Sequence, residues 1–335
     1  MIDSFNVVTA PPSRLYRESP GARALLVLIC LVIGLGLYIW LRPLELLFTV
    51  VQAKLGLDGI KSEFIDVDGY RIHYYVGGSG PPIVLVHGLG GRAEDWVNLM
   101  PQLVHAGHRV YALDLLGYGR SARPLDAAYS IPQEAGIVEK FIAIQKLDRT
   151  DLAGWSMGGW IAMRVALDEP ERIRRLAIYD SAGLRYDVPF DTSLFWPDNP
   201  AKLAALNDLL SPGPVPPVPA IIQRDVFRLV QLNGWIVQRS MGSMLTGADL
   251  LDNRLAGLKM PVLIVWGKQD HITPVSVAYT IHAQVPQSVL EIYDGCGHLA
   301  ARQCSDRIGP NTVAFLTADP PPAAQTKEFP QPAGK

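Results

Sequence analysis

Cysteine and net charge are both scarce in this sequence. Its 335 residues include three cysteines, Cys30, Cys296 and Cys304, which is too few for a disulfide framework. Cys296 and Cys304 could pair in an oxidising compartment, but buried free thiols are the simpler expectation. No spacing of Cys and His indicates a zinc site, and we predict neither a metal nor a cofactor. A net charge of −2 gives no electrostatic basis for binding nucleic acid.

Charged residues are missing from one long stretch near the N-terminus. Residues 24–41 are uncharged and almost all apolar, which is long enough to cross a bilayer. Tyr38 and Trp40 lie at its end, where interfacial aromatic residues are common. A buried soluble helix and a cleaved signal peptide are the alternatives, but no small-residue cleavage site follows Trp40. The sequence therefore predicts a transmembrane anchor over residues 24–42, after a flexible arm over residues 1–23.

The charges around the anchor do not set its orientation, so the side of the membrane on which the rest of the chain lies stays open. Residues 43–58 are apolar with sparse charge, and they either continue the helix or lie along the membrane surface. The basic residues that flank the span are Arg14, Arg17 and Arg23 before it and Arg42, Lys54 and Lys61 after it.

Strand-like and helix-like runs alternate between residues 59 and 317. Several runs, such as residues 82–87, are apolar throughout, as in strands that are buried on both faces of a parallel sheet. The alternation predicts an α/β fold with a mostly parallel sheet and helices on both faces. The expected strands are residues 63–67, 70–76, 82–87, 109–115, 150–153, 173–179, 261–266 and 288–293. The expected helices are residues 92–105, 131–145, 160–167, 275–284 and 300–316.

One connection is too long for this alternation. Residues 185–258 lie between two expected strands and contain a proline-rich run at residues 211–219. An amphipathic helical pattern follows that run. We predict that the segment forms a helical cap over the carboxyl edge of the sheet, where ligands bind in open α/β sheets. The proline-rich tail over residues 318–335 is predicted to be disordered.

Ser156 lies between glycines at the junction of a predicted strand and a predicted helix. The run from Gly154 to Gly159 reads GWSMGG and fits a nucleophile elbow, the sharp turn that exposes a reactive serine. The glycines at 154 and 158 leave room for the strand and the helix to pack closely. The backbone N–H of Met157 would point from the helix N-terminus toward an oxyanion. Ser156 is therefore the predicted nucleophile and Met157 a predicted oxyanion donor.

Two residues that follow predicted strands can complete a catalytic triad with Ser156. A nucleophilic serine needs a base, and the base needs an acid that orients it. His298 follows the last predicted strand, and Asp270 follows the strand over residues 261–266. The order Ser, Asp, His is the one expected for a nucleophile elbow on this kind of sheet. Asp180, one strand earlier, is the alternative acid.

A glycine-rich loop follows the predicted strand over residues 82–87. It reads HGLGG at residues 87–91, and its glycines let the backbone approach a substrate. The N–H of Leu89 is the predicted second oxyanion donor. His87 is expected to shape the loop rather than to act as the base. A phosphate-binding loop is the alternative, but no Gly-Lys-Ser/Thr sequence follows.

Together these motifs resemble those of the α/β-hydrolase fold superfamily, over residues 59–316. Ser156 differs from the aspartate that the family's dehalogenases and epoxide hydrolases carry at the elbow. Within the superfamily the chain resembles membrane-anchored serine lipases and esterases of the monoacylglycerol-lipase type. That narrower resemblance rests on the anchor, on residues 181–184 and on the WGKQD run before the acid. The motifs occur in the family's order at residues 87–90, 114–121, 154–159, 266–270 and 295–298.

The resemblance implies a serine hydrolase of carboxylic esters, with lipid or monoacylglycerol-like substrates and an acyl-enzyme intermediate. Its partners would be that substrate and a membrane, with no cofactor and an oligomeric state that the sequence does not predict. A hydrolase of C–C bonds in ring-cleavage products is the alternative, with the same triad and anion-binding residues in the cap. Arg224, Arg228 and Arg239 could supply those residues. A non-catalytic binding protein is a further alternative, although all three triad residues are present.

Overall fold

The computed structural model describes residues 20–213 and 217–332. It divides into two compact units, one that ends at Pro43 and one that begins at Leu44. Most of the described part of the first unit is helix α1 (Pro20–Leu41), in which no residue is buried. This helix is long and apolar enough to cross a membrane. It begins at Pro20, four residues before the expected span, and proline is tolerated in the first turn of a helix. The expected arm lies almost wholly outside the described residues.

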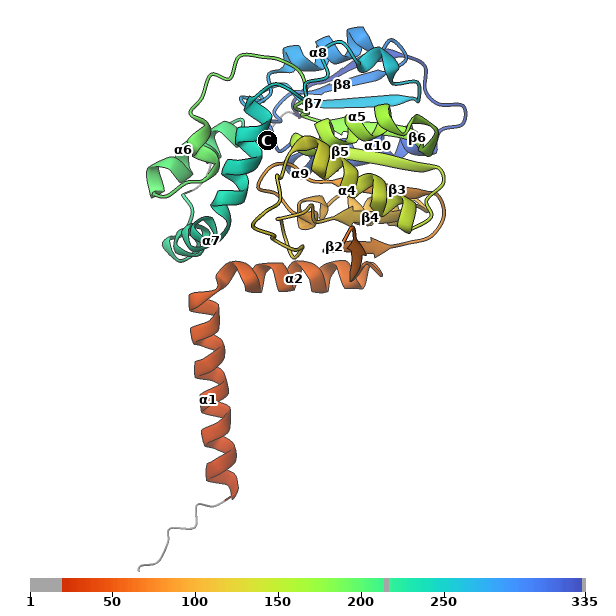
Figure 1. The fold of residues 1–335 in the computed structure, drawn as a ribbon. Helices are drawn as coiled ribbons and strands as arrows, with labels where there is room; N and C mark the ends of the chain where they lie inside the picture. The colour runs from red at the N-terminus through yellow and green to blue at the C-terminus, as the bar shows by residue number, and fades with distance from the viewer. Residues whose placement is uncertain (1–19, 214–216, 333–335) are drawn as a thin grey trace, which may run out of the picture. The chain divides into compact units, whose positions relative to one another are not determined.

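The second unit is built around a nine-stranded sheet with the order β1-β2-β4-β3-β5-β6-β7-β8-β9 (Figure 1). The β1–β2 and β2–β4 pairs are antiparallel, and all other pairs are parallel. Every residue of β5, β7 and β8 is buried, as expected for parallel strands covered on both faces. The predicted α/β fold is confirmed. The strands are β1 (Lys61–Val67), β2 (Tyr70–Gly77), β3 (Pro82–Val86), β4 (Arg109–Leu113), β5 (Thr150–Trp155), β6 (Ile173–Tyr179), β7 (Val262–Gly267), β8 (Val289–Tyr293) and β9 (Gln325–Phe329).

Helices cover both faces of the sheet and enclose two apolar cores. One core includes α4 (Ile131–Ile144), α5 (Met157–Asp168) and α8 (Val275–Gln284). The other includes η1 (Ala93–Trp96), α3 (Met100–His105), α9 (Ala300–Gln303) and α10 (Ser305–Thr317). The single helix expected over residues 92–105 is interrupted between η1 and α3. Pro101 has no N–H to donate, so the α-helix starts again with this proline in its first turn.

The segment predicted as a cap contains η3 (Thr192–Phe195), α6 (Pro200–Leu210), α7 (Ala220–Leu245) and η4 (Leu255–Gly257). In Figure 1, α6 and α7 stand together at one side of the sheet. The 26-residue α7 begins directly after Pro219, which ends the proline-rich run. The cap is tied to the sheet where Leu251 N–H donates to the carbonyl oxygen of Gly183, just beyond β6 (2.8 Å).

Helix α2 (Pro43–Leu57) belongs to the second unit from Leu44 onward, whereas the sequence predicts the start of the domain at residue 59. Leu55 is completely buried in one of the two cores. At the other end of the helix, Leu44 N–H donates to Asp225 Oδ2 on α7 (3.0 Å). The sequence shows α2 as apolar, and only the fold shows which of its residues are buried.

The described part of the C-terminal tail, residues 318–332, contains a strand, so the disorder predicted there is wrong. Residues 333–335 lie outside the described residues. Residues Gln325–Phe329 form β9, which pairs with β8. The Phe329 ring stacks on Tyr293 with centroids 4.5 Å apart, and Arg307 donates to the carbonyl oxygen of Phe329 (3.0 Å). The prolines that suggested disorder flank the strand without interrupting it, which is compatible with an edge position.

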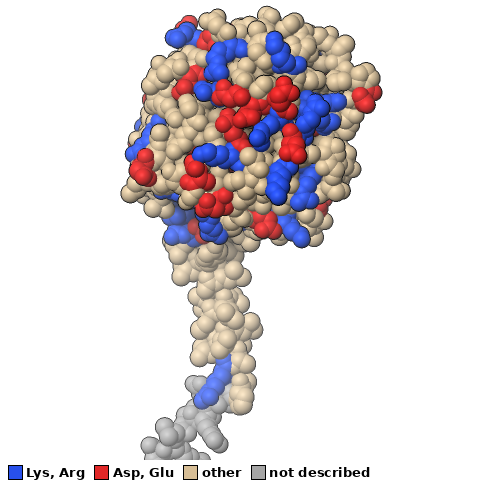
Figure 2. Space-filling model, turned by 45° about the vertical axis from the view of Figure 1, so that its right-hand side comes forward, with Lys and Arg blue, Asp and Glu red and all other residues tan. Residues whose placement is uncertain are grey.

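Acidic and basic side chains are interspersed on the face of the second unit that Figure 2 shows. This mixture agrees with the small net charge of the chain.

Candidate active site

Ser156 lies in the turn between β5 and α5, where the elbow pattern places it. Its φ of 56° and ψ of −121° are unusual for a residue with a side chain, and such strain persists only where the surroundings fix it. A Cβ on Gly154 would lie 2.1 Å from the carbonyl oxygen of Gly158. One on Gly158 would lie 2.2 Å from that of Val86 on β3. Both positions therefore exclude a side chain while the turn keeps this shape.

The three residues predicted as a triad form one line of hydrogen bonds. His298 Nε2 lies 2.9 Å from Ser156 Oγ, and His298 Nδ1 lies 2.8 Å from Asp270 Oδ2. Asp270 and His298 are buried, whereas Ser156 is half-buried. A carboxylate can only accept, so Nδ1 carries the proton and Nε2 is free to accept the serine proton. The arrangement can therefore activate the hydroxyl of Ser156 as a nucleophile.

Asp270 is held by the turn that follows it. Its Oδ1 accepts the N–H groups of Ile272 (2.8 Å) and Thr273 (3.0 Å), and its Oδ2 accepts the hydroxyl of Thr273 (2.7 Å). The Thr273 hydroxyl is also 3.3 Å from His298 Nδ1. Sequence analysis did not single out Thr273. A threonine three residues after an aspartate in a turn is a pattern that could have indicated it.

Asp180, the alternative acid, is not hydrogen-bonded to His298. It is completely buried, and its oxygens accept the N–H groups of Gly267 (2.7 Å) and Ala300 (3.3 Å). Burial, together with the neighbouring Asp270, raises the pKa of Asp180 well above its usual range. Asp180 thus connects the end of β7, which leads to Asp270, with the start of α9, which follows His298.

The loop that carries His298 is fixed from two directions. The indole N–H of Trp155, directly before Ser156, donates to the carbonyl oxygen of His298 (2.6 Å). A disulfide joins Cys296 to Cys304 and encloses His298, so the expectation of free thiols is wrong. The turn after β8 and the short α9 bring the two Cα atoms within 6.3 Å, which sequence spacing alone does not reveal.

The two predicted oxyanion donors flank the nucleophile. Met157 is the first residue of α5, and Leu89 lies in the loop after β3. A Cβ on Gly88 would lie 3.1 Å from Ser156 Cβ, so this loop passes directly against the nucleophile. Within residues 20–213 and 217–332, neither amide donates to a protein acceptor. Both N–H groups are therefore available to a substrate oxygen.

His87 holds the glycine-rich loop in place. Its Nδ1 donates to the carbonyl oxygen of Gly88 (2.7 Å), and its Nε2 accepts the N–H of Leu115 (3.1 Å). These partners require one neutral tautomer. Burial lowers the pKa of His87, in agreement with that neutral state. These hydrogen bonds are the contacts expected of a residue that fixes the shape of the loop.

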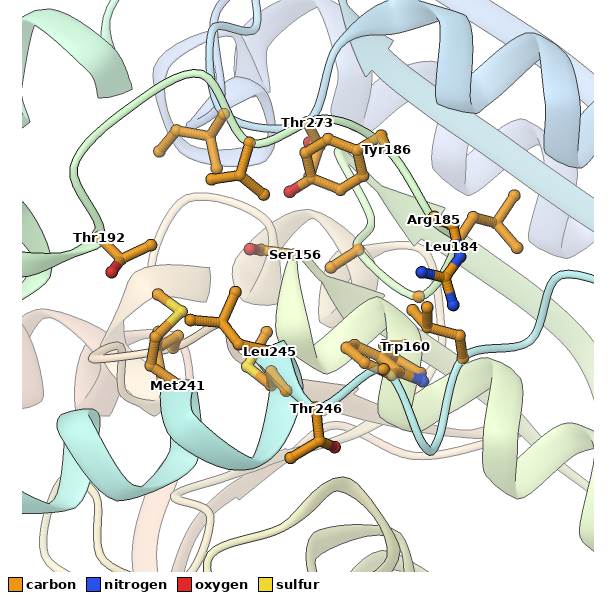
Figure 3. Close-up of a pocket in the computed structure, with 18 of the residues that line it drawn as sticks. Ser156, Trp160, Leu184, Arg185, Tyr186, Thr192, Met241, Leu245, Thr246 and Thr273 are labelled. Carbon is orange, nitrogen blue, oxygen red and sulfur yellow. The ribbon is translucent and has the colours of Figure 1, made fainter.

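A cavity of about 190 Å³ opens onto Ser156 (Figure 3). Most of its lining is apolar and comes from α7 and from the segment after β6, and a cavity of this kind suits a largely apolar ligand. Arg185 is the one charged residue that lines it within the described ranges, and sequence analysis did not single it out. The larger apolar lining residues are Phe190, Phe195, Met241, Met244, Leu245 and Ile272.

The family model for the alpha/beta hydrolase fold matches residues 81–212 and 222–301, which is more than half of the chain. The chain belongs to the α/β hydrolase family. This result confirms the superfamily that the motifs indicated.

Relatives of this α/β hydrolase act on more than one kind of substrate. The 2-hydroxy-6-oxononadienedioate/2-hydroxy-6-oxononatrienedioate hydrolase of Klebsiella pneumoniae is 28% identical over 282 residues, which cover 76% of this chain and 95% of the relative. The crystal structure of a membrane phospholipase A, described as a bacterial virulence factor, is 27% identical with a TM-score of 0.76. That match covers 88% of this chain and 96% of the other. A proposed lipase from Acinetobacter baumannii is 25% identical with a TM-score of 0.71, covering 80% and 94%.

The three cap arginines that could have bound an anion do not line the cavity of this α/β hydrolase. Arg228 pairs with Asp225 (2.7 Å). Arg239 donates to the carbonyl oxygens at positions 125 and 127 (2.7 and 2.8 Å). Arg224, the third, is likewise absent from the lining. These arginines therefore give the alternative of a C–C bond hydrolase no support in this cavity.

Proposed function

We propose that this α/β hydrolase cleaves carboxylic esters of lipids through an acyl-enzyme on Ser156. The observation that carries the proposal is the hydrogen-bonded line of Ser156, His298 and Asp270 beside an apolar cavity. Similarity to a membrane phospholipase A and to a proposed lipase supports an ester substrate. The apolar lining supports a substrate with a hydrocarbon chain.

In the first half of the proposed reaction, Ser156 Oγ attacks the ester carbonyl carbon while His298 Nε2 takes the hydroxyl proton. Asp270 stabilises the imidazolium that results. The N–H groups of Leu89 and Met157 donate to the oxyanion of the tetrahedral intermediate. When the intermediate collapses, the ester C–O bond breaks and the leaving alcohol takes the proton from His298.

In the second half, water attacks the acyl-enzyme and gives a proton to His298 Nε2. A second tetrahedral intermediate forms in the same oxyanion site. Its collapse breaks the bond to Ser156 Oγ, which recovers its proton from His298 and releases a carboxylic acid. His298 takes and returns the proton in each step of this cycle.

Hydrolysis of C–C bonds in ring-cleavage products is the second candidate, because a relative acts on 2-hydroxy-6-oxo acids. Such substrates carry carboxylates, whereas the cavity lining within the described residues offers a single cation, Arg185. The cavity therefore favours an ester with a long apolar part over a small dianion.

Membrane attachment through α1 is part of the proposal. A 22-residue helix is about 33 Å long, which matches the hydrocarbon core of a bilayer. The similarity to a membrane phospholipase A supports an anchor rather than a cleaved signal sequence. The Cys296–Cys304 disulfide supports a catalytic unit on the oxidising side of that membrane, because disulfides persist in such compartments.

A substrate panel tests the proposed function. The full-length protein in detergent micelles is assayed on p-nitrophenyl esters, on monoacylglycerols and on a vinylogous ring-cleavage ketone. We expect turnover of the first two and trapping of Ser156 by a fluorophosphonate. Turnover of the ketone with no ester hydrolysis would replace the proposal with the second candidate.

A further inference from the structure

The cavity extends to both sides of the nucleophile, and only one side carries a charged residue among those that the structure describes. In Figure 3, Ser156 lies between Met241 and Thr192 on one side and Arg185 and Trp160 on the other. Met241 comes from α7 and is nearly buried, whereas Arg185 follows β6 and is exposed. An ester that reacts at Ser156 would therefore place its two halves in unlike surroundings.

Arg185 is anchored through its backbone, and its side chain forms no hydrogen bond or ion pair with the described residues. Its N–H donates to Asp252 Oδ1 (3.1 Å), and Leu184 before it is buried. No carboxylate within the described ranges forms an ion pair with its guanidinium. The guanidinium lies against the turn after α7, 3.6 Å from where a Cβ on Gly247 would be.

Asp252 accepts the backbone N–H of Arg185, and two further acidic side chains, one on the segment after β6 and one in the cap, have partners of their own. Asp191 accepts the N–H (2.8 Å) and the hydroxyl (2.7 Å) of Ser193. Asp249 lies 3.9 Å from a guanidinium nitrogen of Arg164. An unpaired guanidinium in a cavity otherwise lined by apolar and neutral polar groups attracts an anion, and its planar fork suits phosphate and carboxylate.

The geometry points to Arg185 as a binding site for an anionic group on the substrate, opposite the side that takes the hydrocarbon chain. This inference rests on the proposed function, because it assumes that an ester reacts at Ser156. A charged group would lose hydration without gaining a partner beside Met241, so it belongs beside Arg185. The hydrocarbon chain then occupies the side of Met241, and the acidic group leaves with the alcohol.

Short soluble esters test the site without interference from membrane adsorption. The full-length protein in micelles is assayed on dibutyrylglycerol and on dibutyrylglycerol phosphate, which differ only in the phosphate. We expect Arg185→Gln to raise KM for the phosphate ester about tenfold with little change in kcat. The effect on the uncharged ester should be at least five times smaller. Arg185→Lys should recover part of the loss, because it keeps the charge but not the fork.

Two controls separate a local site from general electrostatics. Arg172→Gln removes a half-buried arginine in η2 (Pro170–Arg172), which does not line the cavity, and should leave both esters unaffected. Inorganic phosphate and acetate should each compete with the phosphate ester in the wild type and not in Arg185→Gln. Stronger competition by phosphate would indicate a phosphate group, and stronger competition by acetate a carboxylate.

The outcomes distinguish this site from the proposed function. Equal loss on both esters, or no loss, in Arg185→Gln would overturn the anion site and leave the esterase intact. If the wild type hydrolyses no ester, the proposed function fails. The anion site is then tested by KM for the carboxylate-bearing ring-cleavage ketone. An Arg185→Gln variant with unchanged KM for that ketone would overturn the anion site as well.

Discussion

Asp270 Oδ2 accepts both the Nδ1–H of His298 and the hydroxyl of Thr273. Asp180 forms no hydrogen bond with the His298 ring and accepts backbone N–H groups instead. Two buried acids thus lie near the same histidine with different partners. This difference makes their contributions separable by mutation.

Asp270→Asn should reduce kcat by about four orders of magnitude, because an amide favours the wrong imidazole tautomer. Asp180→Asn should reduce kcat far less, since it keeps a carbonyl oxygen that can accept an N–H group. Kinetics on a p-nitrophenyl ester measure both. A larger loss in Asp180→Asn would move the orienting acid to β6.

Ser156→Ala should abolish fluorophosphonate labelling and lower turnover by several orders of magnitude, since only binding and the oxyanion donors remain. Its urea midpoint should stay close to that of the wild type. Near-normal turnover in Ser156→Ala would refute the acyl-enzyme.

Stability should depend on pH through Glu134. This side chain on α4 is buried, its Oε2 accepts the N–H of Leu116 (3.1 Å), and its Oε1 has no partner within the described residues. Burial raises the pKa of Glu134 to about 8. The unfolded chain releases this proton near pH 4.5 and the folded chain near pH 8, so stability should fall as the pH rises between these values.

Glu134→Gln removes that titration. Relative to the wild type, its free energy of unfolding should increase between pH 5 and pH 8, by at most about 1.4 kcal/mol per pH unit. Urea denaturation at the two pH values measures the difference. Parallel pH profiles for the two proteins would contradict a protonated Glu134.

Two truncations separate the anchor from the fold. Removal of residues 1–43 should release the protein from alkaline-washed membranes and preserve hydrolysis of a soluble ester, because the catalytic unit begins at Leu44. Removal of residues 1–58 should lower the free energy of unfolding by about 2–5 kcal/mol through the loss of buried Leu55 alone. Full-length protein in the soluble fraction without detergent, or equal stability of the two truncations, would contradict this division.

Substitution in the cavity should change the preferred chain length. Met241→Trp adds volume on the side assigned to the hydrocarbon chain and should shift the preference among p-nitrophenyl esters from long toward short acyl groups. Leu232→Trp is the matched control, because Leu232 is on the same helix but exposed and outside the lining. An unchanged profile in Met241→Trp would exclude this side as the acyl site.

The parts of the site that follow directly from backbone requirements could be predicted from the sequence. Gly154 and Gly158 are required by close contacts in the elbow, and such requirements leave a readable pattern. The positions of Asp270 and His298 follow from the rule that functional loops gather at the carboxyl edge of a parallel sheet.

The remaining parts depend on contacts between distant segments. Thr273 and Arg185 lie at the site because of the paths that the turn after Asp270 and the segment after β6 take. No periodic pattern in the sequence specifies these paths. The same holds for the disulfide, for Leu55 in α2 and for β9. The proline content of the tail and the apolar character of α2 describe composition, whereas their places in the fold depend on the surfaces available to them.

Strand β9 lies beyond residue 301, where the match to the family model ends. The carbonyl oxygen of Phe329 accepts the N–H of Asp294, four residues before His298, at 2.9 Å. A gene with a stop codon before position 325 would still encode all the hydrolase motifs. Its product would lack the strand next to the histidine loop, so a comparison by motifs alone would count a damaged protein as intact.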